Sequence, residues 1–471
     1  MRSPSLLKGL SWLLALNLLV KPVWIFFIDR QVQNIVGNEA YGRYFAVLNL
    51  SYLLLFLADA GLSNLLNQRL ASGGNLSLTS AFRLKAFLLV AYILACVLAA
   101  WLSGLRQWEI LTYVLAIQAL NSLFLFLRGM VTAAQFYTAD AWFSVIDKLM
   151  MTLICGGMLY TTLAGPISLL RFLQVQSLCT ALAVMAVMFF LYRRYPRNAG
   201  QPASSPALSL LKRSFPFALA VLLMSVHYRL DGFLLERLHP RGALEAGLYA
   251  AAYRLLDAGN MIGYLAASFL LPFFARHRND RPLLQQTLFE TRNGLLFIAL
   301  AMAAFALFFS RWIQELLYHD SGAYASRLIA LCVAVLPAYY LVHIYGSLLV
   351  AIERLRLFIF TLAGSVLLNL ALNLAFMPSM GAEGCCWAAL ASQYACGLAV
   401  YIAATRAAGL GAGLASLTKT LVAAAFAGLL FYAGKAAVIN VWIILAAAAC
   451  LTLVMLAVSW GPLKKYFVSL R

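Results

Sequence analysis

The feature that most constrains this chain is a succession of long apolar runs. Hydrophobic residues make up 64% of the 471 residues, charged residues make up only 11%, and the mean hydropathy is +0.87. A soluble domain is about half apolar and about a quarter charged. No soluble fold of this length has an interior large enough to bury so much apolar side chain. The sequence therefore predicts a membrane protein whose surface is largely in contact with lipid.

An apolar run needs about 20 residues to cross a bilayer as a helix. About fourteen runs meet this requirement, at 10–28, 41–64, 86–103, 110–130, 142–163, 167–191, 214–234, 246–272, 293–310, 327–350, 357–378, 384–405, 420–436 and 441–459. They do not alternate apolar and polar residues, as the strands of a membrane barrel would. We therefore expect an all-α membrane protein with about fourteen transmembrane helices.

The basic residues indicate how the chain is oriented. If the N-terminus is cytoplasmic and the runs alternate, 22 of the 35 Lys and Arg residues fall on the cytoplasmic side and eight on the opposite side. By the positive-inside rule, both ends of the chain are expected in the cytoplasm. Most of the formal net charge of +19 then reflects topology, and nucleic acid is not an expected partner. The eight cysteines form no C-x-x-C pair, so neither a metal site nor a disulfide framework is expected. No cofactor is expected either.

A polar break divides the chain. It contains RNAGQPASSPALS, whose Pro, Ser and Gly content is typical of a flexible linker. The expected organisation is an N-terminal lobe of six spans at 1–192, a cytoplasmic linker at 193–213, a C-terminal lobe of six spans at 214–406, and two additional helices at 407–471. The glycine-rich sequence GLGAGL at 409–414 follows a membrane helix rather than a strand, so it is expected to be a loop and not a phosphate site.

A short internal sequence repeat supports a pseudo-twofold relation between the two lobes. Gly42-x-Tyr44-x-Ala46 follows the first span, and Gly247-x-Tyr249-x-Ala251 follows the seventh. A glutamate precedes each of these segments. Transporters are commonly built from such repeats, with the substrate site between them.

Several charges lie within the expected spans, where they are energetically costly. The basic ones are Lys21, Arg128, Lys148, Arg171, Arg229 and Arg254, and the acidic ones are Asp59, Asp147, Asp231 and Asp257. Two interpretations remain open for each: an internal ion pair that holds the helices together, or a group that lines a water-filled cavity. Arg254 and Asp257 are three residues apart and can pair on one helical face, whereas adjacent Asp147 and Lys148 are not expected to face each other.

Lys21 has no acidic residue within one helical turn, and Pro22, which bends a helix, follows it. Either a cationic, water-accessible interior or a lysine that reaches the outer interface would explain this pattern. A slightly positive interior suits an anion such as a diphosphate. The candidate substrate-binding residues are Lys21, Arg30, Arg128, Lys148, Arg229 and Arg254. The candidate ion-coupling carboxylates are Asp29, Asp231 and Asp257.

Three segments resemble one known family. They are Val36-Gly37-Asn-Glu-Ala-Tyr41-Gly42-Arg-Tyr44, the stretch from Tyr228-Arg-Leu-Asp231 to Tyr253-Arg254, and Asn369-Leu-Ala-Leu-Asn373 through Pro378-Ser-Met-Gly381-Ala-Glu-Gly384. Their order and spacing resemble the O-antigen-type (Wzx-like) polysaccharide flippases of the multidrug/oligosaccharidyl-lipid/polysaccharide (MOP) exporter superfamily. The resemblance covers essentially the whole chain.

The resemblance implies a flippase that moves an undecaprenyl-diphosphate-linked oligosaccharide across a bacterial inner membrane by alternating access, without catalysing a covalent reaction. It also implies membrane lipids and the polysaccharide polymerase machinery as partners, and it leaves proton or sodium coupling open. A lipid II flippase and a multidrug antiporter of the same superfamily are alternatives. A membrane-embedded polymerase or glycosyltransferase is an alternative of another class, but no long outer loop or acidic sugar-nucleotide motif supports it.

Overall fold

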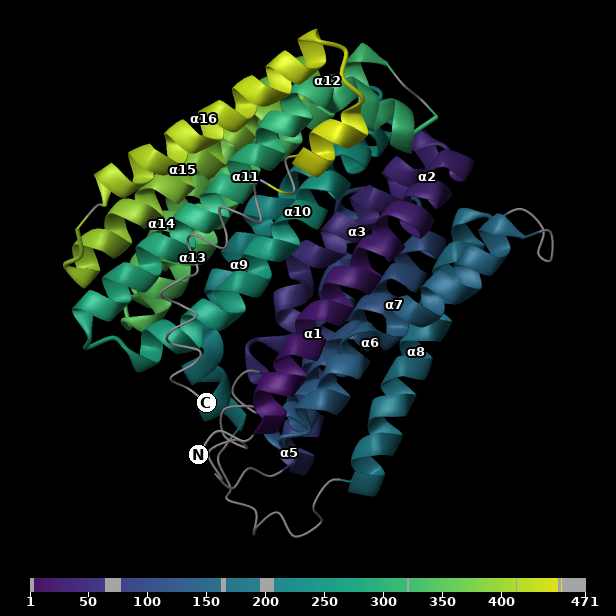
Figure 1. Ribbon diagram of the computed structural model, residues 1–471. Coiled ribbons are helices and arrows are strands. Elements are labelled where there is room, and N and C mark those ends of the chain that lie inside the picture. The colour runs from purple at the N-terminus through teal and green to yellow at the C-terminus, as the bar shows by residue number, and fades with distance from the viewer. Residues whose placement is uncertain are drawn as a thin grey trace. The chain divides into compact units, whose positions relative to one another are not determined.

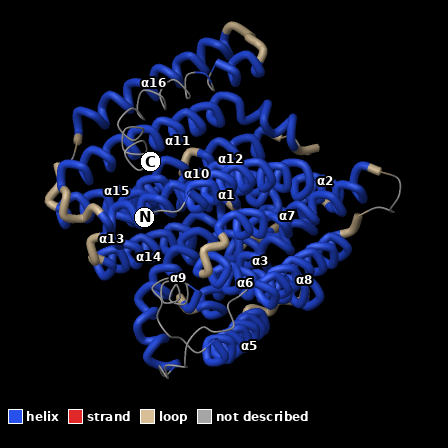
Figure 2. The backbone as a smooth tube through the Cα atoms, turned by 60° about the horizontal axis from the view of Figure 1, so that its bottom comes forward, coloured by secondary structure: helices blue, strands red, loops and turns tan. Residues whose placement is uncertain are grey.

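The computed structural model describes residues 4–63, 78–161, 167–194, 207–319, 322–411, 413–447 and 450, without the side chains of 4–11, 14, 78 and 207–214. All regular secondary structure in these residues is helical, as expected from the sequence (Figure 2). The helices are α1 (Pro4–Val23), η1 (Trp24–Asp29), α2 (Arg30–Val36), α3 (Asn38–Asp59), α5 (Leu78–Leu102), α6 (Trp108–Ala133), α7 (Tyr137–Tyr160), α8 (Leu169–Arg194), α9 (Ala207–Leu238), α10 (Gly242–Arg276), α11 (Arg281–Leu317), α12 (Ala323–Val333), α13 (Leu336–Ala351), α14 (Leu355–Met380), α15 (Ala382–Ala408) and α16 (Leu414–Ala436).

The described residues contain 12 candidate membrane spans. They overlap the second to the thirteenth of the expected runs, and α12 and α13 together make one span, Ala323–Ala351. The first expected run corresponds to α1 and to η1, which follows it directly. The fourteenth, 441–459, lies mostly outside the described residues. The protein is therefore an all-α, multi-pass membrane protein.

The chain forms two compact units, Met1–Gly247 and Leu248–Arg471. Helix α9 follows the expected linker in sequence, yet it belongs to the first unit. Helix α8 continues to Arg194 and α9 begins at Ala207, so both edges of the expected linker are helical, and residues 195–206 lie outside the described part.

In the first unit, α1 packs along α7, α3 along α9 and α5, and α6 along α8 (Figure 1). One apolar core lies where the end of α3 meets α5, α6 and α8. Its members include Leu62, Leu88, Phe126, Leu127 and Val187. These helices are apolar on most sides. Their few polar residues are therefore candidates for roles other than contact with lipid or apolar packing.

In the second unit, α15 packs against α12, α13 and α14, and α11 packs against α16. The asparagines of the flippase-like segment join two of these helices. Asn369 donates a 3.2 Å hydrogen bond to Ser392 of α15, and Asn373 donates to the carbonyl oxygen of Asn369 at 3.0 Å. All three side chains are buried. These residues therefore act as polar contacts between and within membrane helices.

The glycine-rich sequence between α15 and α16 is a loop, as expected, and it lies against one face of α11. Gly409 and Gly413 have positive φ angles of +62° and +60°, which glycine adopts without strain. A Cβ on Gly413 would lie 2.6 Å from the Phe289 ring, and Arg292 donates a 3.1 Å hydrogen bond to the carbonyl oxygen of Gly413. The glycines thus let the loop pack closely on α11, where α16 begins.

Candidate functional site

The first membrane helix changes its hydrogen-bond pattern just after Lys21 and Pro22. Pro22 has no N–H to donate, and the residues Trp24–Asp29 form a π-helical segment, in which the N–H of Arg30 reaches the carbonyl oxygen of Ile25. Such segments are rare and frequently lie at functional sites. Pro22 was expected to bend this helix, and the structure shows a change of helix type directly after it.

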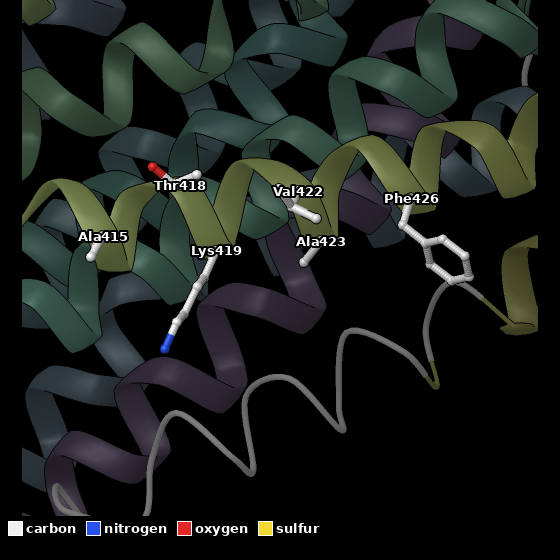
Figure 3. A pocket seen from close by; sticks show the side chains of 6 residues that line it. All are labelled: Ala415, Thr418, Lys419, Val422, Ala423 and Phe426. Atoms are coloured by element: carbon white, nitrogen blue, oxygen red, sulfur yellow. The ribbon is translucent and has the colours of Figure 1, made fainter.

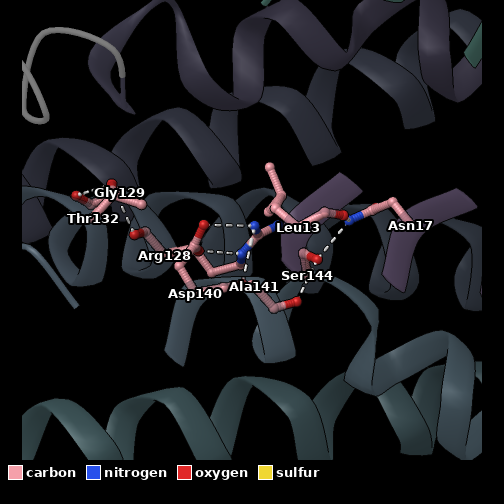
Figure 4. Close-up of polar contacts among 8 residues, drawn as sticks. All are labelled: Leu13, Asn17, Arg128, Gly129, Thr132, Asp140, Ala141 and Ser144. Atoms are coloured by element: carbon pink, nitrogen blue, oxygen red, sulfur yellow. Dashed lines mark hydrogen bonds and ion pairs between the residues drawn. The ribbon is translucent and has the colours of Figure 1, made fainter. Parts of the chain in front are cut away.

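Helices α1 and α7 run parallel and in register. The side-chain amide of Asn17 donates a 2.7 Å hydrogen bond to the Ser144 hydroxyl (Figure 4). Further along α7, a Cβ on Gly156 would lie 3.6 Å from Ile28 of η1, which continues α1. Both residue numbers increase together, so the helices point in the same direction.

This register places two lysines beside each other. Asn17 and Ser144 are 127 residues apart, as are Lys21 and Lys148, which lie about one turn further along each helix. Lys21 is half-buried and lies within electrostatic range of Lys148, Arg128 and Asp147. Within the described part of the chain, Lys21 makes neither a hydrogen bond nor an ion pair.

Lys148 has two partners close by. Its Nζ lies 3.4 Å from a carboxylate oxygen of Asp147 and 5.3 Å from the centre of the Trp24 ring, which stacks on Phe172. The expectation that adjacent Asp147 and Lys148 do not face each other is wrong, because the long lysine side chain bends back along its own helix. The cation–π contact also ties α7 to the π-helical segment.

Arg128, near the end of α6, pairs with Asp140 in the first turn of α7. Its Nε donates to one carboxylate oxygen at 2.7 Å and its Nη2 donates to the other at 3.1 Å (Figure 4). The two side chains are 16% and 10% exposed. This two-point geometry is the strong form of an arginine–carboxylate pair.

We call Lys21, Arg128, Asp140, Asp147 and Lys148 the α1–α7 charge cluster. Three cations and two carboxylates leave it with a formal charge of +1 at pH 7. Its members come from three helices of one compact unit. Chemically, a partly buried cluster with an excess of positive charge can hold an anion, because an anion would offset the charge that the carboxylates leave uncompensated.

Arg30 and Asp29 lie elsewhere, at the far end of the π-helical segment. Asp29 accepts a 2.9 Å hydrogen bond from the hydroxyl of Tyr41, and the Nε of Arg30 donates to the carbonyl oxygen of Phe26 at 2.8 Å. The structure therefore does not bring Arg30 into the α1–α7 charge cluster. Both residues occupy the side that the basic-residue count predicts to be outside.

Arg229 and Asp231 lie on α9, in the same compact unit but on another helix pair. The guanidinium of Arg229 lies 4.9 Å from the centre of the Tyr52 ring of α3. Asp231 is only 2% exposed. Arg229 therefore faces α3 rather than the contact between α1 and α7.

Arg254 and Asp257 lie on α10, in the second compact unit. Arg254 is buried, and its Nη1 donates a 2.7 Å hydrogen bond to the hydroxyl of Tyr318. The same hydroxyl donates to the carbonyl oxygen of Ala251 at 3.1 Å. Asp257 is half-buried on the same helix.

Lys85 is a buried cation, although by the alternation of spans it is one of the 22 basic residues expected on the cytoplasmic side. It is 1% exposed. Its Nζ donates to the carboxylate of Asp59 at 2.8 Å, to the carbonyl oxygen of Ala58 at 2.9 Å and to the hydroxyl of Ser122 at 2.8 Å. The sequence did contain an indication of this ion pair. Asp59 lies inside an expected span, and a buried carboxylate requires a cation from a neighbouring helix.

Arg292 is a second such residue, and it is fully buried. Besides its bond to Gly413, it donates to Asn293 at 3.1 Å and to Ser416 at 2.9 Å. Both Lys85 and Arg292 bind backbone carbonyl groups at the ends of helices or in loops, so they stabilise chain turns on the side predicted to be cytoplasmic.

A shallow hollow lies along one face of α16. It is lined by Ala415, Thr418, Lys419, Val422, Ala423 and Phe426 (Figure 3). Apart from Lys419 and Thr418, this surface is apolar. It contains none of the span charges that form the α1–α7 charge cluster, so we do not assign the anion site to it.

Solved structures with a similar fold were found, whereas no curated protein sequence matches the chain. The lipid II flippase MurJ in an inward closed conformation superimposes with a TM-score of 0.68 at 12% identity, over 96% of this chain and 99% of that one. An inward-facing multidrug resistance MATE transporter of the MOP superfamily has a TM-score of 0.62 at 13% identity, over 84% of this chain and 94% of that one. A MOP superfamily transporter from Pyrococcus furiosus, described as having a binding pocket of reverse polarity, has a TM-score of 0.63 at 13% identity, over 86% and 95%.

At these identities the likeness concerns the fold, which is that of the MOP superfamily. A family model described as polysaccharide biosynthesis protein matches residues 6–277, more than half of the chain. Those residues include the whole α1–α7 charge cluster and the helices that carry it. The chain therefore belongs to the polysaccharide biosynthesis protein family and has a MOP-superfamily fold.

Proposed function

We propose that the protein moves an undecaprenyl-diphosphate-linked oligosaccharide, the repeat unit of O-antigen or of another surface polysaccharide, from the cytoplasmic to the periplasmic leaflet of a bacterial inner membrane. The observation that carries this proposal is the α1–α7 charge cluster, in which Lys21 lies half-buried beside Lys148 without an ion pair of its own in the described residues. A diphosphate loses hydration inside the membrane, and fixed cations can replace that hydration. The polysaccharide family supports an oligosaccharide cargo.

Within this proposal the cations have different roles. Lys21 binds the diphosphate directly, because it has no competing carboxylate partner. Lys148 and Arg128 are each paired with a carboxylate. They contribute to the positive electrostatic potential, and part of their bonding to the carboxylates can be replaced by bonding to the diphosphate. Arg229 on α9 and Arg254 on α10 are further candidate contacts of the anion, each within its own unit, and Arg30 is the candidate contact at the outer end of the first span.

The proposed transport cycle is alternating access between a lobe at 1–192 and a lobe at 214–406, with the helices after 407 as an addition. No covalent step is required, so the protein acts as a transporter and not as an enzyme. The similar MATE structure is named a multidrug resistance transporter. The excess of positive charge in the cluster argues against cationic drugs as the cargo of this protein. The fold of a lipid II flippase makes lipid II an alternative cargo.

The test is complementation of a flippase-null strain at matched membrane abundance. We expect Lys21→Ala to lose glycan export, Lys21→Arg to retain most of it, and Lys435→Ala to behave as wild type, because Lys435 is an exposed cation at the end of α16. Wild-type export by Lys21→Ala would remove Lys21 from the site.

A lipid analysis of the same strains separates the two cargoes. If the cargo is a surface polysaccharide unit, the Lys21→Ala strain accumulates the lipid-linked oligosaccharide on the inner leaflet while cell-wall synthesis continues. Accumulation of lipid II and arrest of cell-wall synthesis would assign the protein to lipid II instead.

A further inference from the structure

The indole ring of Trp24 lies against the α1–α7 charge cluster but carries no charge of its own. Trp24 is the first residue of η1 and follows Lys21 by three residues, so the two side chains lie on nearly the same face of the first membrane helix. The register of α1 and α7 separates Asn17 from Ser144 by 127 residues, and the same separation places Trp24 at the level of Met151. Trp24 therefore faces α7 about one turn beyond the two lysines of the cluster.

The ring has a fixed neighbour on α8. Trp24 is buried and stacks on Phe172, with the ring centres 5.7 Å apart and an angle of 6° between the ring planes. Phe172 is itself fully buried. The stacked pair thus forms an apolar wall where the first membrane helix meets α7 and α8, and all three belong to one compact unit.

The ammonium group of Lys148 lies over this ring. Its Nζ is 5.3 Å from the centre of the Trp24 ring and 3.6 Å from the Sδ of Met151. Both of these partners are neutral and polarisable. The Lys148 side chain is 25% exposed, so its ammonium is accessible in part, whereas the ring that supports it is buried.

The carboxylate of Asp147 is a looser partner of the same ammonium. The two groups are 3.4 Å apart, whereas the Nε of Arg128 is 2.7 Å from the carboxylate of Asp140. A carboxylate also compensates the charge of the cation that it holds, but an aromatic ring does not, because it has no net charge. The position of Lys148 is therefore fixed largely by neutral groups, and much of its positive charge remains available to an anion.

We propose that Trp24 is a positioning residue of the anion site, and that its ring holds the ammonium of Lys148 beside Lys21 without neutralising it. The inference rests on the proposed function, because it assigns Trp24 a role in binding the diphosphate. An ammonium that is already held in place loses less freedom when the anion binds, so the affinity for the anion is higher. Tryptophan suits this role because its ring attracts cations more strongly than the rings of tyrosine and phenylalanine.

The first test measures the binding of inorganic diphosphate to the purified full-length protein in lipid nanodiscs, by titration calorimetry. We expect Trp24→Leu to weaken this binding about tenfold, because the ammonium of Lys148 loses the ring. Trp12→Leu is the matched control, since Trp12 lies on the same membrane helix but is exposed and stacks on Trp142 of α7, outside the cluster. This control should bind diphosphate as the wild type does. Equal affinities of Trp24→Leu and Trp12→Leu would overturn the proposal.

A double variant separates positioning from a general disturbance of the fold. If Trp24 acts through Lys148, adding Trp24→Leu to Lys148→Met should not weaken diphosphate binding any further. A further loss of about tenfold in the Lys148→Met background would show that the ring supports the whole unit, and it would contradict the proposal.

Another measurement does not depend on whether the leucine variant folds. Trp24 is replaced by tetrafluorotryptophan, which is introduced by nonsense suppression. The fluorine atoms largely preserve the shape of the ring but withdraw electron density from its face, which weakens its attraction for a cation. We expect the affinity for diphosphate to fall about fivefold. An unchanged affinity would overturn the role of Trp24.

The lysine variants distinguish a failure of this inference from a failure of the proposed function. If Lys21→Ala and Lys148→Met weaken diphosphate binding and the changes at Trp24 do not, the anion site stands and the role of Trp24 is wrong. If neither lysine variant changes the affinity, the anion site itself is contradicted, and the role of Trp24 is overturned with it.

Discussion

The side-chain amide of Asn17 and the hydroxyl of Ser144 join α1 to α7 at a distance of 2.7 Å, one turn before Lys21 and Lys148 (Figure 4). Asn17 also donates to the carbonyl oxygen of Leu13 at 2.7 Å. Both side chains are buried. This contact fixes the register that places the two lysines beside each other, so a change at Ser144 should affect the site without removing any of its charges.

We expect Ser144→Ala to lower the free energy of unfolding by about 1 kcal/mol, the usual contribution of one interhelical hydrogen bond. The protein should still fold, but glycan export should fall clearly below the wild-type level, because the relative position of the two lysines becomes less defined. Thermal unfolding in detergent and complementation measure the two effects. Ser177→Ala is the control, since Ser177 on α8 is half-buried and, among the described residues, its hydroxyl bonds only to the carbonyl oxygen of Gln174 in its own helix. Equal glycan export by Ser144→Ala and Ser177→Ala would show that transport does not depend on the register of α1 and α7.

The contributions of Arg128 and Asp140 to the stability of the protein should depend on each other, because the two residues form one ion pair. Arg128→Gln leaves a largely buried carboxylate without its cation, and such losses cost about 3 kcal/mol. The exchanged pair, Arg128→Asp with Asp140→Arg, should recover part of this stability. Arg311→Gln provides a comparison, because Arg311 pairs with Glu315 on an exposed surface, where the cost is about 0.5 kcal/mol or less. Thermal stability of the four purified proteins checks the prediction, and similar values for the two single variants would contradict it.

Lys85 should be required for folding rather than for transport. Lys85→Met removes three donated hydrogen bonds and leaves Asp59 without its cation, so we expect a marked loss of protein from the membrane. Lys85→Met combined with Asp59→Asn should restore abundance in part. If the double variant is abundant and exports glycan, the pair is structural. If it is abundant but inactive, Lys85 or Asp59 also takes part in transport.

Asp231 and Asp257 are the proposed ion-coupling carboxylates. A carboxylate whose surroundings alternate between two states of the protein can bind and release a counter-ion. We expect Asp231→Asn or Asp257→Asn to insert normally and to lose the dependence of transport on a proton or sodium gradient. Asp29→Asn is tested in parallel, since Asp29 bonds to Tyr41 on the outer side. Normal gradient-dependent transport by all three variants would exclude the coupling role.

Much of the architecture could be predicted because lipid imposes a simple rule on the sequence. A helix that crosses the bilayer must be apolar over about 20 residues, so the 12 candidate spans overlap runs that are visible in the sequence. The disturbance at Pro22 could also be predicted, because proline lacks a hydrogen-bond donor wherever it lies. These properties are local, and each depends only on residues that are close together in the chain.

The partners of the buried charges depend on which helices are neighbours, and the sequence contains little information about that. Arg128 with Asp140 and Lys85 with Asp59 are separated by 12 and 26 residues, and no helical periodicity links them. Glycine shows the same distinction. The sequence identified Gly42 and Gly247 as equivalent positions of a repeat. Only the structure showed that their backbones approach closely, since a Cβ on Gly42 would overlap the carbonyl oxygen of Ala243 and would lie 2.6 Å from the backbone nitrogen of Gly247. Close contact is a property of two surfaces and not of either segment alone.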